Sequence, residues 1–279
     1  MGRVTVRRKL RAIDTTTGEV VTRMDTLAGE EPLEIRAGAE VITVTMRTPG
    51  HDLELIHGFL NAEGVITGPA DVRAACYCAG SVISTETGQP ENTYNVMEVS
   101  LVPAATARVA GAIRNFATTS SCGVCGSASI DDVRGKVPYD IATNDARLEA
   151  STVAGLPNLL REQQATFDRT GGLHAAGLYD LDTTELEVRE DVGRHNAADK
   201  VIGARLLDDR TGERAALVLS GRISFELVQK AAMAGVPVIA AVSAPSSLAV
   251  ELAADLGITL AGFVRGGRLN VYTHPVRII

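Results

Sequence analysis

Hydrophobic positions in the last part of the chain alternate between short, continuously apolar segments and segments whose apolar residues recur at helical spacing. Apolar segments of this length, bounded by small or polar residues, are typical of buried strands. The pattern predicts strands over residues 215–220, 236–242 and 258–264, separated by helices over 224–234 and 247–256. This βαβαβ order predicts an α/β fold with a parallel sheet and right-handed crossovers.

The segments upstream have a more mixed pattern. Between the middle of the chain and residue 214, helices are expected over 157–167 and 196–207, with a hairpin formed by 175–180 and 186–189. In the first part of the chain, β-branched segments predict strands over 4–10, 20–23, 41–46, 72–77 and 94–102, and helical spacing predicts helices over 52–63 and 104–114. The chain is therefore predicted to divide into a smaller α+β domain, residues 1–117, and an α/β domain, residues 118–279.

Length and charge narrow the range of functions. With 279 residues and 45% hydrophobic content, the chain is long enough to bury a substantial core. It carries 27 basic and 34 acidic residues, whereas a nucleic-acid-binding protein would present a basic domain. The N-terminus lacks the apolar segment of a signal peptide, and no apolar run reaches membrane-spanning length. We expect a cytoplasmic protein that binds neither nucleic acid nor membrane.

Two of the four cysteines, Cys122 and Cys125, lie three residues apart in a stretch of glycines and small hydroxyl residues. Gly123 and Gly126 permit a tight turn that presents the thiols instead of burying them. Backbone N–H groups at the start of a helix, or a nearby arginine, lower the pKa of such a thiol and make it a nucleophile at neutral pH. The same spacing is compatible with a structural zinc half-site or a thioredoxin-like redox pair.

Small and cationic residues follow all three predicted parallel strands, at the edge of the sheet where α/β proteins bind ligands. Backbone N–H groups at helix starts and the forked donors of arginine suit phosphate groups. Residues 258–279 contain three arginines and no acidic residue, although the whole chain is acidic. The sequence therefore predicts a phosphorylated ligand at this edge, held by Arg222, Ser243, Ser246, Ser247, Arg265 and Arg268. Taken singly, Ser246 or Ser247 has the simpler interpretation of a helix cap, and Gly266-Gly267 that of a turn.

Other polar motifs have less specific interpretations. His195 lies in a charged segment before a helix, where it acts as an acid or base, helps to hold a thiolate, or belongs to an ordinary helix start. Asp199 and Lys200, further along that helix, are expected to form solvent-exposed pairs. His57 falls on the apolar face of its helix, where a core histidine is the simpler interpretation.

The remaining cysteines, Cys76 and Cys78, lie on a predicted strand. With Cys122 and Cys125 they would complete a four-thiolate zinc site, although Cys-x-Cys is an unusual spacing for zinc. A zinc-dependent deaminase needs a His-x-Glu motif and a proline before its Cys-x-x-Cys. Neither is present, because no histidine is followed two residues later by glutamate and Ser121 precedes Cys122.

Six motifs in a fixed order resemble the formate dehydrogenase accessory sulfurtransferases, the FdhD family: residues 44–50, 119–126, 170–176, 189–196, 220–230 and 243–252. The resemblance implies a cytidine-deaminase-like α/β domain without the deaminase zinc, a smaller α+β domain and a homodimer. It also implies a sulfurtransferase that takes sulfur from a cysteine desulfurase. The sulfur would pass to the molybdenum (or tungsten) bis(molybdopterin guanine dinucleotide) cofactor before that cofactor enters the catalytic subunit of formate dehydrogenase.

By position in these motifs, Cys122 matches the cysteine that forms the persulfide intermediate. The segment that matches the family's cofactor-binding residues consists of Phe263, Val264, Arg265, Gly266, Gly267 and Arg268. Cys125 would resolve the persulfide by attacking it and forming a disulfide. Two alternatives remain open at this point: a non-catalytic chaperone of the molybdenum cofactor, and a zinc-binding or redox protein. The roles of Cys76, Cys78 and His195 are not assigned by the resemblance.

Overall fold

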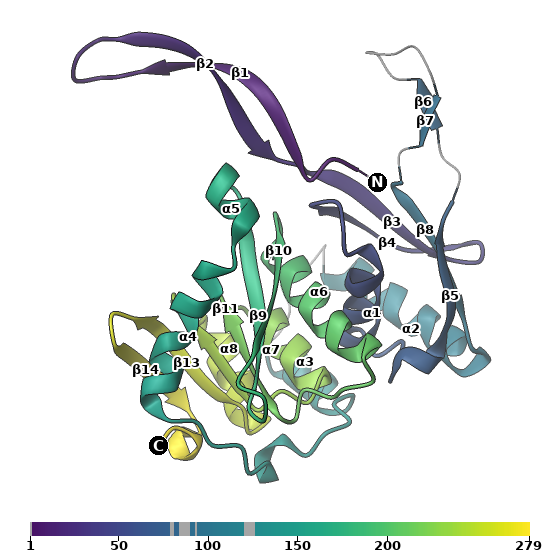
Figure 1. The fold of residues 1–279 in the computed structure, drawn as a ribbon. Coiled ribbons are helices and arrows are strands. Elements are labelled where there is room, and N and C mark those ends of the chain that lie inside the picture. Colours follow the sequence, from purple (N-terminus) through teal and green to yellow (C-terminus); the bar gives the residue numbers. More distant parts are fainter. Residues whose placement is uncertain (1, 79–80, 84–89, 93, 120–125) are drawn as a thin grey trace.

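The computed structural model describes residues 2–78, 81–83, 90–92, 94–119 and 126–279. Figure 1 shows a body built around a six-stranded sheet, with a smaller part containing a four-stranded sheet beside it. Two β-ribbons extend from this smaller part. Helices and strands alternate through the body, so the α/β fold predicted from the hydrophobic pattern is confirmed.

The six-stranded sheet has the strand order β10-β9-β11-β12-β13-β14. Its three central strands β11, β12 and β13 run parallel, as predicted from the alternating pattern. The sheet as a whole is mixed, because β9–β10 and β13–β14 are hairpins and β9 also pairs antiparallel with β11. The strands are β9 (His174–Asp180), β10 (Leu186–Asp191), β11 (Ala215–Leu219), β12 (Val238–Ala241), β13 (Thr259–Arg265) and β14 (Arg268–Thr273).

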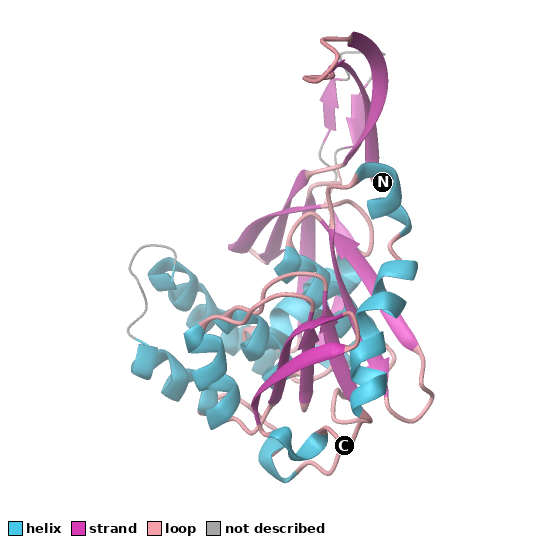
Figure 2. Ribbon diagram, turned by 90° about the vertical axis from the view of Figure 1, so that its left-hand side faces the viewer, coloured by secondary structure: helices cyan, strands magenta, loops and turns pink. Residues whose placement is uncertain are grey.

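Helices cover both faces of this sheet (Figure 2). On one face, α6, α7 and α8 pack through a core that includes Val201, Leu227 and Leu252, and on the other α4 packs through Leu156 and Leu160. Burial on both faces explains the continuously apolar strands. Among the described residues, no helix combines the length and apolarity needed to cross a bilayer. The helices are α3 (Gly126–Arg134), α4 (Ala150–Glu162), α5 (Ala165–Thr170), α6 (Arg194–Leu207), α7 (Phe225–Met233) and α8 (Ser247–Asp255), with 3-10 turns at Ile141–Thr143 and Pro275–Arg277.

The helix predicted over residues 157–167 is wrong in its bounds. That range covers the end of α4, a break at Gln163 and Gln164, and the start of α5. α4 begins earlier, at Ala150, and contains Pro157 in its interior. Proline removes one backbone hydrogen bond from a helix. Here the burial of the surrounding apolar face against the sheet outweighs that loss.

The smaller part has a four-stranded sheet in the order β4-β3-β8-β5, and its apolar face packs on α1 and α2. β3 was not predicted, because Pro32 and Glu34 interrupt its apolar pattern, yet its Leu33 and Ile35 are completely buried. His57 is a buried core residue, as expected, and its Nδ1 lies 2.7 Å from the backbone oxygen of Leu53. The elements are β3 (Glu31–Ala37), β4 (Glu40–Arg47), α1 (Asp52–Ala62), a 3-10 turn at Pro69–Asp71, β5 (Val72–Tyr77), β8 (Val96–Leu101) and α2 (Pro103–Thr119).

The two ribbons are antiparallel pairs that stand apart from both sheets (Figure 1). The longer one pairs β1 (Thr5–Ile13) with β2 (Val20–Ala28), and the shorter one pairs β6 (Ser81–Ile83) with β7 (Pro90–Asn92). The predicted boundary between the domains, at residue 117, falls inside α2. The division of the chain into two domains stays a prediction.

The smaller part meets the body where α1 packs directly on α6. A Cβ atom added to Gly58 would lie 1.9 Å from the backbone oxygen of Asp199, and one added to Gly203 would lie 1.8 Å from that of Glu54. Both distances are far below any van der Waals contact. The two backbones therefore touch through glycines, and no other residue fits at either position.

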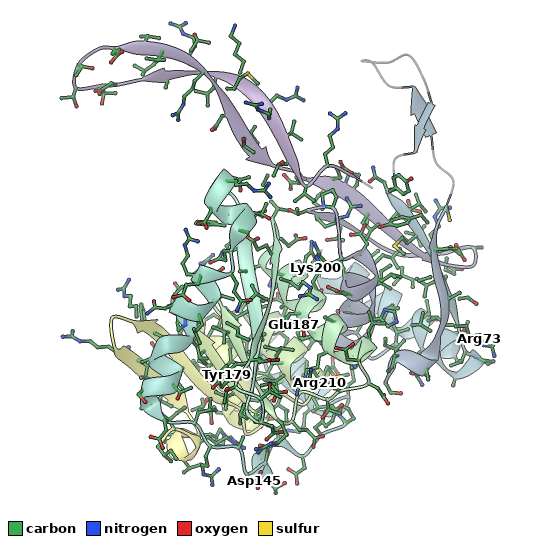
Figure 3. All side chains as sticks on the ribbon, viewed as in Figure 1. Arg73, Asp145, Tyr179, Glu187, Lys200 and Arg210 are labelled. Carbon is green, nitrogen blue, oxygen red and sulfur yellow. The ribbon has the colours of Figure 1, made fainter. Side chains whose placement is uncertain are left out.

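Buried polar groups join the same two parts of the chain. The side chain of Asp191 accepts a hydrogen bond of 3.0 Å from the backbone N–H of Thr48. The Nζ atom of Lys200, labelled in Figure 3, lies 2.7 Å from Oδ2 of Asp191 and donates to the Thr48 backbone oxygen at 2.8 Å. Because Asp191 and Lys200 are 0% and 1% exposed, this pairing compensates the removal of both charges from water.

The prediction that Asp199 and Lys200 form solvent-exposed pairs is wrong. Asp199 is 2% exposed and accepts a 2.7 Å hydrogen bond from Lys230 of α7, while Lys200 binds Asp191. Burial raises the pKa of the Asp199 carboxyl to about 6, and the Lys230 ammonium opposes that shift. Helix α6 is covered by α1 on one side and by the sheet on the other, so the side chains of Asp199 and Lys200 do not reach solvent.

The α1–α6 contact generates a stability prediction. Gly203→Ala should lower the free energy of unfolding by about 2 kcal/mol or more, because the new methyl group must push the two helices apart. Gly155→Ala in α4 is the matched control, since nothing lies within 4 Å of its added Cβ. That variant should be neutral or more stable by up to about 1 kcal/mol, the helix-propensity difference. Urea unfolding measures both; equal midpoints for the two variants would contradict the prediction.

Candidate functional site

The carboxyl ends of the three parallel strands meet at one edge of the large sheet. The segments that follow them are held together by backbone hydrogen bonds: Ile223 donates to Ala244 at 3.1 Å, Ser246 to Ile223 at 3.0 Å, and Phe263 to Ser243 at 3.1 Å. The motifs that the sequence analysis selected after β11, β12 and β13 are therefore neighbours. We term this region the strand-end edge.

Two further elements deliver polar side chains to the strand-end edge. β9 runs antiparallel to β11, so its first residue, His174, lies beside the end of β11, where the Ser220 hydroxyl accepts a 2.8 Å hydrogen bond from the backbone N–H of Ala175. α6 begins next to them and contributes Arg194 and His195 at its first positions. The edge therefore combines two histidines with an arginine in addition to the predicted residues.

A cavity of about 650 Å³ opens at the strand-end edge, between α4, α5 and the ends of the strands. Its cationic or titratable lining residues are Arg161, His174 and Arg265, and no aspartate or glutamate occurs among the described residues that line it. Arg161 also forms an ion pair with Asp168 at 2.5 Å and stacks 4.8 Å from the centre of the Phe167 ring. In a chain with net charge -7, a cavity with this lining favours an anionic ligand.

The segment from Phe263 to Arg268 forms the end of β13, the turn and the start of β14. Val264 and Arg265 line the cavity, and the Arg265 guanidinium lies 6.0 Å from the centre of the Phe263 ring. Gly266 and Gly267 have φ angles of 57° and 74°, which glycine adopts without strain, so they form the two-residue turn of the hairpin. Arg268 pairs directly with Arg265 across this turn, and both arginines are exposed.

The other predicted ligand residues are close to this edge but do not line the cavity among the residues that the structure describes. Ser246 accepts a 3.3 Å hydrogen bond from the backbone N–H of Ala249 and caps α8, which confirms its simpler interpretation. Ser243 contributes its backbone oxygen to the bond with Phe263. Ser247 and Arg222 are exposed, and Ser247 is the first residue of α8.

The two histidines of the edge are held in the neutral form. Burial, with the nearby Lys230 and Arg194 cations, lowers the pKa of His195 to about 4, and Glu226 opposes the shift. Burial and Arg194 also lower the pKa of His174. His195 Nε2 lies within hydrogen-bonding distance, 3.0 Å, of the Ser224 hydroxyl. A neutral imidazole at this position can accept a hydrogen bond at one ring nitrogen and donate one from the other.

Sequence reasoning missed Arg161, His174 and Arg194. Arg161 and Arg194 lie on helices whose packing places them at the edge. No local motif marks Arg161, whereas Arg194 lies in the segment 189–196 that carries the family resemblance. His174 belongs to one of the segments that carry the family resemblance, which was the available signal. The Nε atom of Arg194 is buried and has no hydrogen-bond acceptor among the described residues.

The predicted reactive cysteines, Cys122 and Cys125, lie outside the described residues, between the end of α2 at Thr119 and the start of α3 at Gly126. Cys76 and Cys78 are free thiols at the end of β5, the first exposed and the second partly exposed. Within the described part of the chain, no group of three or more His, Cys, Asp or Glu residues is arranged to hold a metal ion.

The depressed pKa of His195 predicts a pH dependence of stability. Because the folded-state pKa, about 4, lies below the ordinary value of 6.5, the unfolded chain binds the extra proton first. The contribution of His195 is therefore complete above pH 6.5 and is lost as the pH falls from 6.5 towards 4. NMR titration of the His195 ring should show no protonation at pH 6, and His195→Gln should flatten the loss of thermal stability over that range. A ring that titrates at or above pH 6.5 would contradict this.

Comparison with known proteins agrees with the motifs and the fold. The sequence model of the FdhD/NarQ family matches residues 28–279. A protein of Nocardia farcinica named "Sulfur carrier protein FdhD" is 50% identical over 99% of this chain and 96% of its own. Proteins of the same name from Streptomyces coelicolor and Mycobacterium tuberculosis are each 51% identical over 100% of this chain and 97% and 100% of their own.

A solved structure has the same fold. It comes from Desulfotalea psychrophila, and its description assigns it provisionally as a formate dehydrogenase accessory protein. It superposes with a TM-score of 0.72 at 24% identity and covers 99% of this chain and 100% of its own. With a family match over residues 28–279 and relatives about half identical over their whole length, the chain belongs to the FdhD/NarQ family.

Proposed function

We propose that this chain is a sulfur carrier that serves the maturation of formate dehydrogenase. The observation that carries the proposal is its identity of about half, over the full length, with proteins named as sulfur carriers. In finer detail, Cys122 takes sulfane sulfur from a cysteine desulfurase and holds it as a persulfide. The acceptor is the molybdenum or tungsten bis(molybdopterin guanine dinucleotide) cofactor, which this protein binds as a substrate.

The chemistry needs one nucleophilic thiol and a second thiol nearby. The Cys122 thiolate attacks the outer sulfur of the desulfurase persulfide, a new S–S bond forms, and the desulfurase cysteine leaves as a thiolate. In the delivery step, the Cys125 thiolate attacks Sγ of Cys122 and releases hydrosulfide next to the metal. The disulfide that remains between Cys122 and Cys125 is reduced by cellular thiols in a further exchange.

The strand-end edge supports the recognition of a guanine dinucleotide. A pyrophosphate is an anion, and the cavity there has Arg161 and Arg265 in its lining with no carboxylate among the described residues. Arg268 adds a second cation on the same hairpin as Arg265. Neutral His174, at the start of β9, can donate or accept a hydrogen bond, and it adds no charge to the cavity. The exposed Arg222 and Ser247, with the partly buried Ser243, would extend contact with so large a ligand beyond the cavity.

We further propose that the protein acts in the cytoplasm as a homodimer and hands its product to the catalytic subunit of formate dehydrogenase. Cysteine desulfurases and their sulfur acceptors meet in reducing compartments, where free thiols such as Cys76 and Cys78 persist. Sulfur transfer from one protein thiol to another makes the chain a sulfurtransferase in the catalytic sense.

The persulfide step can be tested directly by mass spectrometry. After incubation with a cysteine desulfurase and cysteine, the intact protein should gain sulfur, and peptide mapping should place it on Cys122. Cys122→Ala should not gain sulfur or support formate dehydrogenase activity, whereas the matched controls Cys76→Ala and Cys78→Ala should behave as wild type. Cys125→Ala should load sulfur but deliver it poorly. Retained maturation by Cys122→Ala would instead favour a chaperone, and stoichiometric zinc in chelator-washed protein would favour a zinc protein.

The arginines of the β13–β14 hairpin should affect nucleotide binding without affecting sulfur loading. A hydrogen bond to a charged group is worth about 1.5–3 kcal/mol, so Arg265→Ala should weaken binding of guanosine diphosphate by about ten- to a hundredfold. Arg268→Ala should weaken it as well. Calorimetry measures the affinity, and the persulfide assay is the control. Unchanged affinity in both variants would place the nucleotide elsewhere; folded variants that no longer accept sulfur would move these arginines to the persulfide step.

A further inference from the structure

A second cavity, of about 640 Å³, lies where the C-terminal end of α1 faces α2 and α3. It shares no described lining residue with the cavity at the strand-end edge. Its walls are partly apolar, with Ile66, Ala107 and Met233 among the lining residues, and partly polar, with Asn61, Glu63, Thr67, Arg108, Asp132 and Lys136. None of these side chains takes part in the proposed sulfur transfer.

On the α1 wall of this cavity, Asn61 has an acceptor without a donor. The residue is 3% exposed, and its Oδ1 atom has no hydrogen-bond partner among the described residues. Its amide nitrogen makes only a long, 3.5 Å bond to the backbone oxygen of Ile66. Buried polar atoms in proteins are nearly always paired. Asn61 lines the cavity, so a small rotation of its side chain would present the unpaired Oδ1 atom to a ligand donor.

Glu63, two residues further on, adds a negative charge that is poorly compensated. Burial raises the pKa of its carboxyl, and only the more distant Lys230 and Lys136 ammonium groups oppose the shift. Lys230 is already bound to Asp199 at 2.7 Å. The last turn of α1 contains no basic residue, although the C-terminal end of a helix attracts cations. Three features of this wall therefore favour a positively charged hydrogen-bond donor.

The opposite wall, formed by α2 and α3, carries two cations, Arg108 and Lys136, together with the exposed carboxylate of Asp132. Arg108 is occupied, because it forms an ion pair with Asp71 at 3.0 Å and donates to the Val65 backbone oxygen at 2.8 Å. Lys136 is exposed and forms no close ion pair with a described side chain, although its ammonium group acts on Glu63 at longer range. Within the described part of the chain, the cavity thus has unpaired acceptors on one wall, an unpaired ammonium on the other, and apolar side chains between them.

We propose that this cavity binds a free α-amino acid with an apolar side chain. The amino acid's ammonium group donates to Oδ1 of Asn61 and to the Glu63 carboxylate, and its carboxylate meets the Lys136 ammonium. The apolar side chain lies against Ile66 and Met233, which are 1% and 4% exposed. The bound molecule would bridge α1 to α2 and α3, the two helices on either side of residues 120–125. This inference does not depend on the sulfur-carrier proposal.

Three related probes separate the contributions of the two charged ends: L-leucine, isoamylamine, which lacks its carboxylate, and isocaproate, which lacks its ammonium group. Calorimetry with the purified full-length chain at neutral pH should show the tightest binding for L-leucine. Isoamylamine should bind about tenfold more weakly, since it loses one charged hydrogen bond, and isocaproate should show no binding. Absence of L-leucine binding, or isocaproate binding as tight as that of L-leucine, would overturn the proposal.

Variants of two lining residues test whether L-leucine binds in this cavity. Glu63→Gln should weaken L-leucine binding by about tenfold or more, and Asn61→Leu should weaken it without exposing a new polar group. Glu40→Gln, which removes an exposed carboxylate from β4, is the matched control and should bind as wild type does. Thermal unfolding without ligand shows that each variant is folded. Wild-type affinity in both folded cavity variants would overturn the assignment of this cavity.

Discussion

The direct contact between α1 and α6 is the constraint on which the arrangement of the molecule depends. Gly58 and Gly203 allow the helices to touch, and the close approach brings the Thr48 backbone to Asp191 and Lys200. Asp191 and Lys200 pair with each other, and the Thr48 backbone adds one hydrogen bond to each charge, so separation of the two parts would remove a hydrogen bond from each buried ion. Because α6 begins at the strand-end edge, the same contact fixes the position of Arg194 and His195.

The strand-end edge is cationic through arginines and not through its histidines. Burial and neighbouring cations lower the pKa of His174 and His195, so both are neutral where an anionic ligand would bind. The proposed attraction to phosphate would then depend on Arg161, Arg265 and Arg268, whose charge does not vary over physiological pH. The charge that the protein presents at this edge should therefore change little between pH 6 and 8.

The two cavities differ in their chemical preferences. The one at the strand-end edge has arginines and no described carboxylate in its lining, whereas the one beside α1 has an orphaned amide oxygen and a poorly compensated carboxylate. Helices α2 and α3, which border the second cavity, also flank the Cys122 segment. Ligands of different charge could therefore act on different sides of one protein without competing for the same residues.

The sequence by itself determined the α/β class, the three parallel strands and the family, because apolar periodicity and short motifs are local properties. It also selected Val264 and Arg265, which follow a strand and line the cavity. The tertiary structure alone decided that Asp199 and Lys200 are buried, since their partners Lys230 and Asp191 lie on other elements. It likewise assigned Ser246 to a helix cap and brought Arg161 and His174 to the edge, because contacts between distant segments leave no periodic signal in the chain.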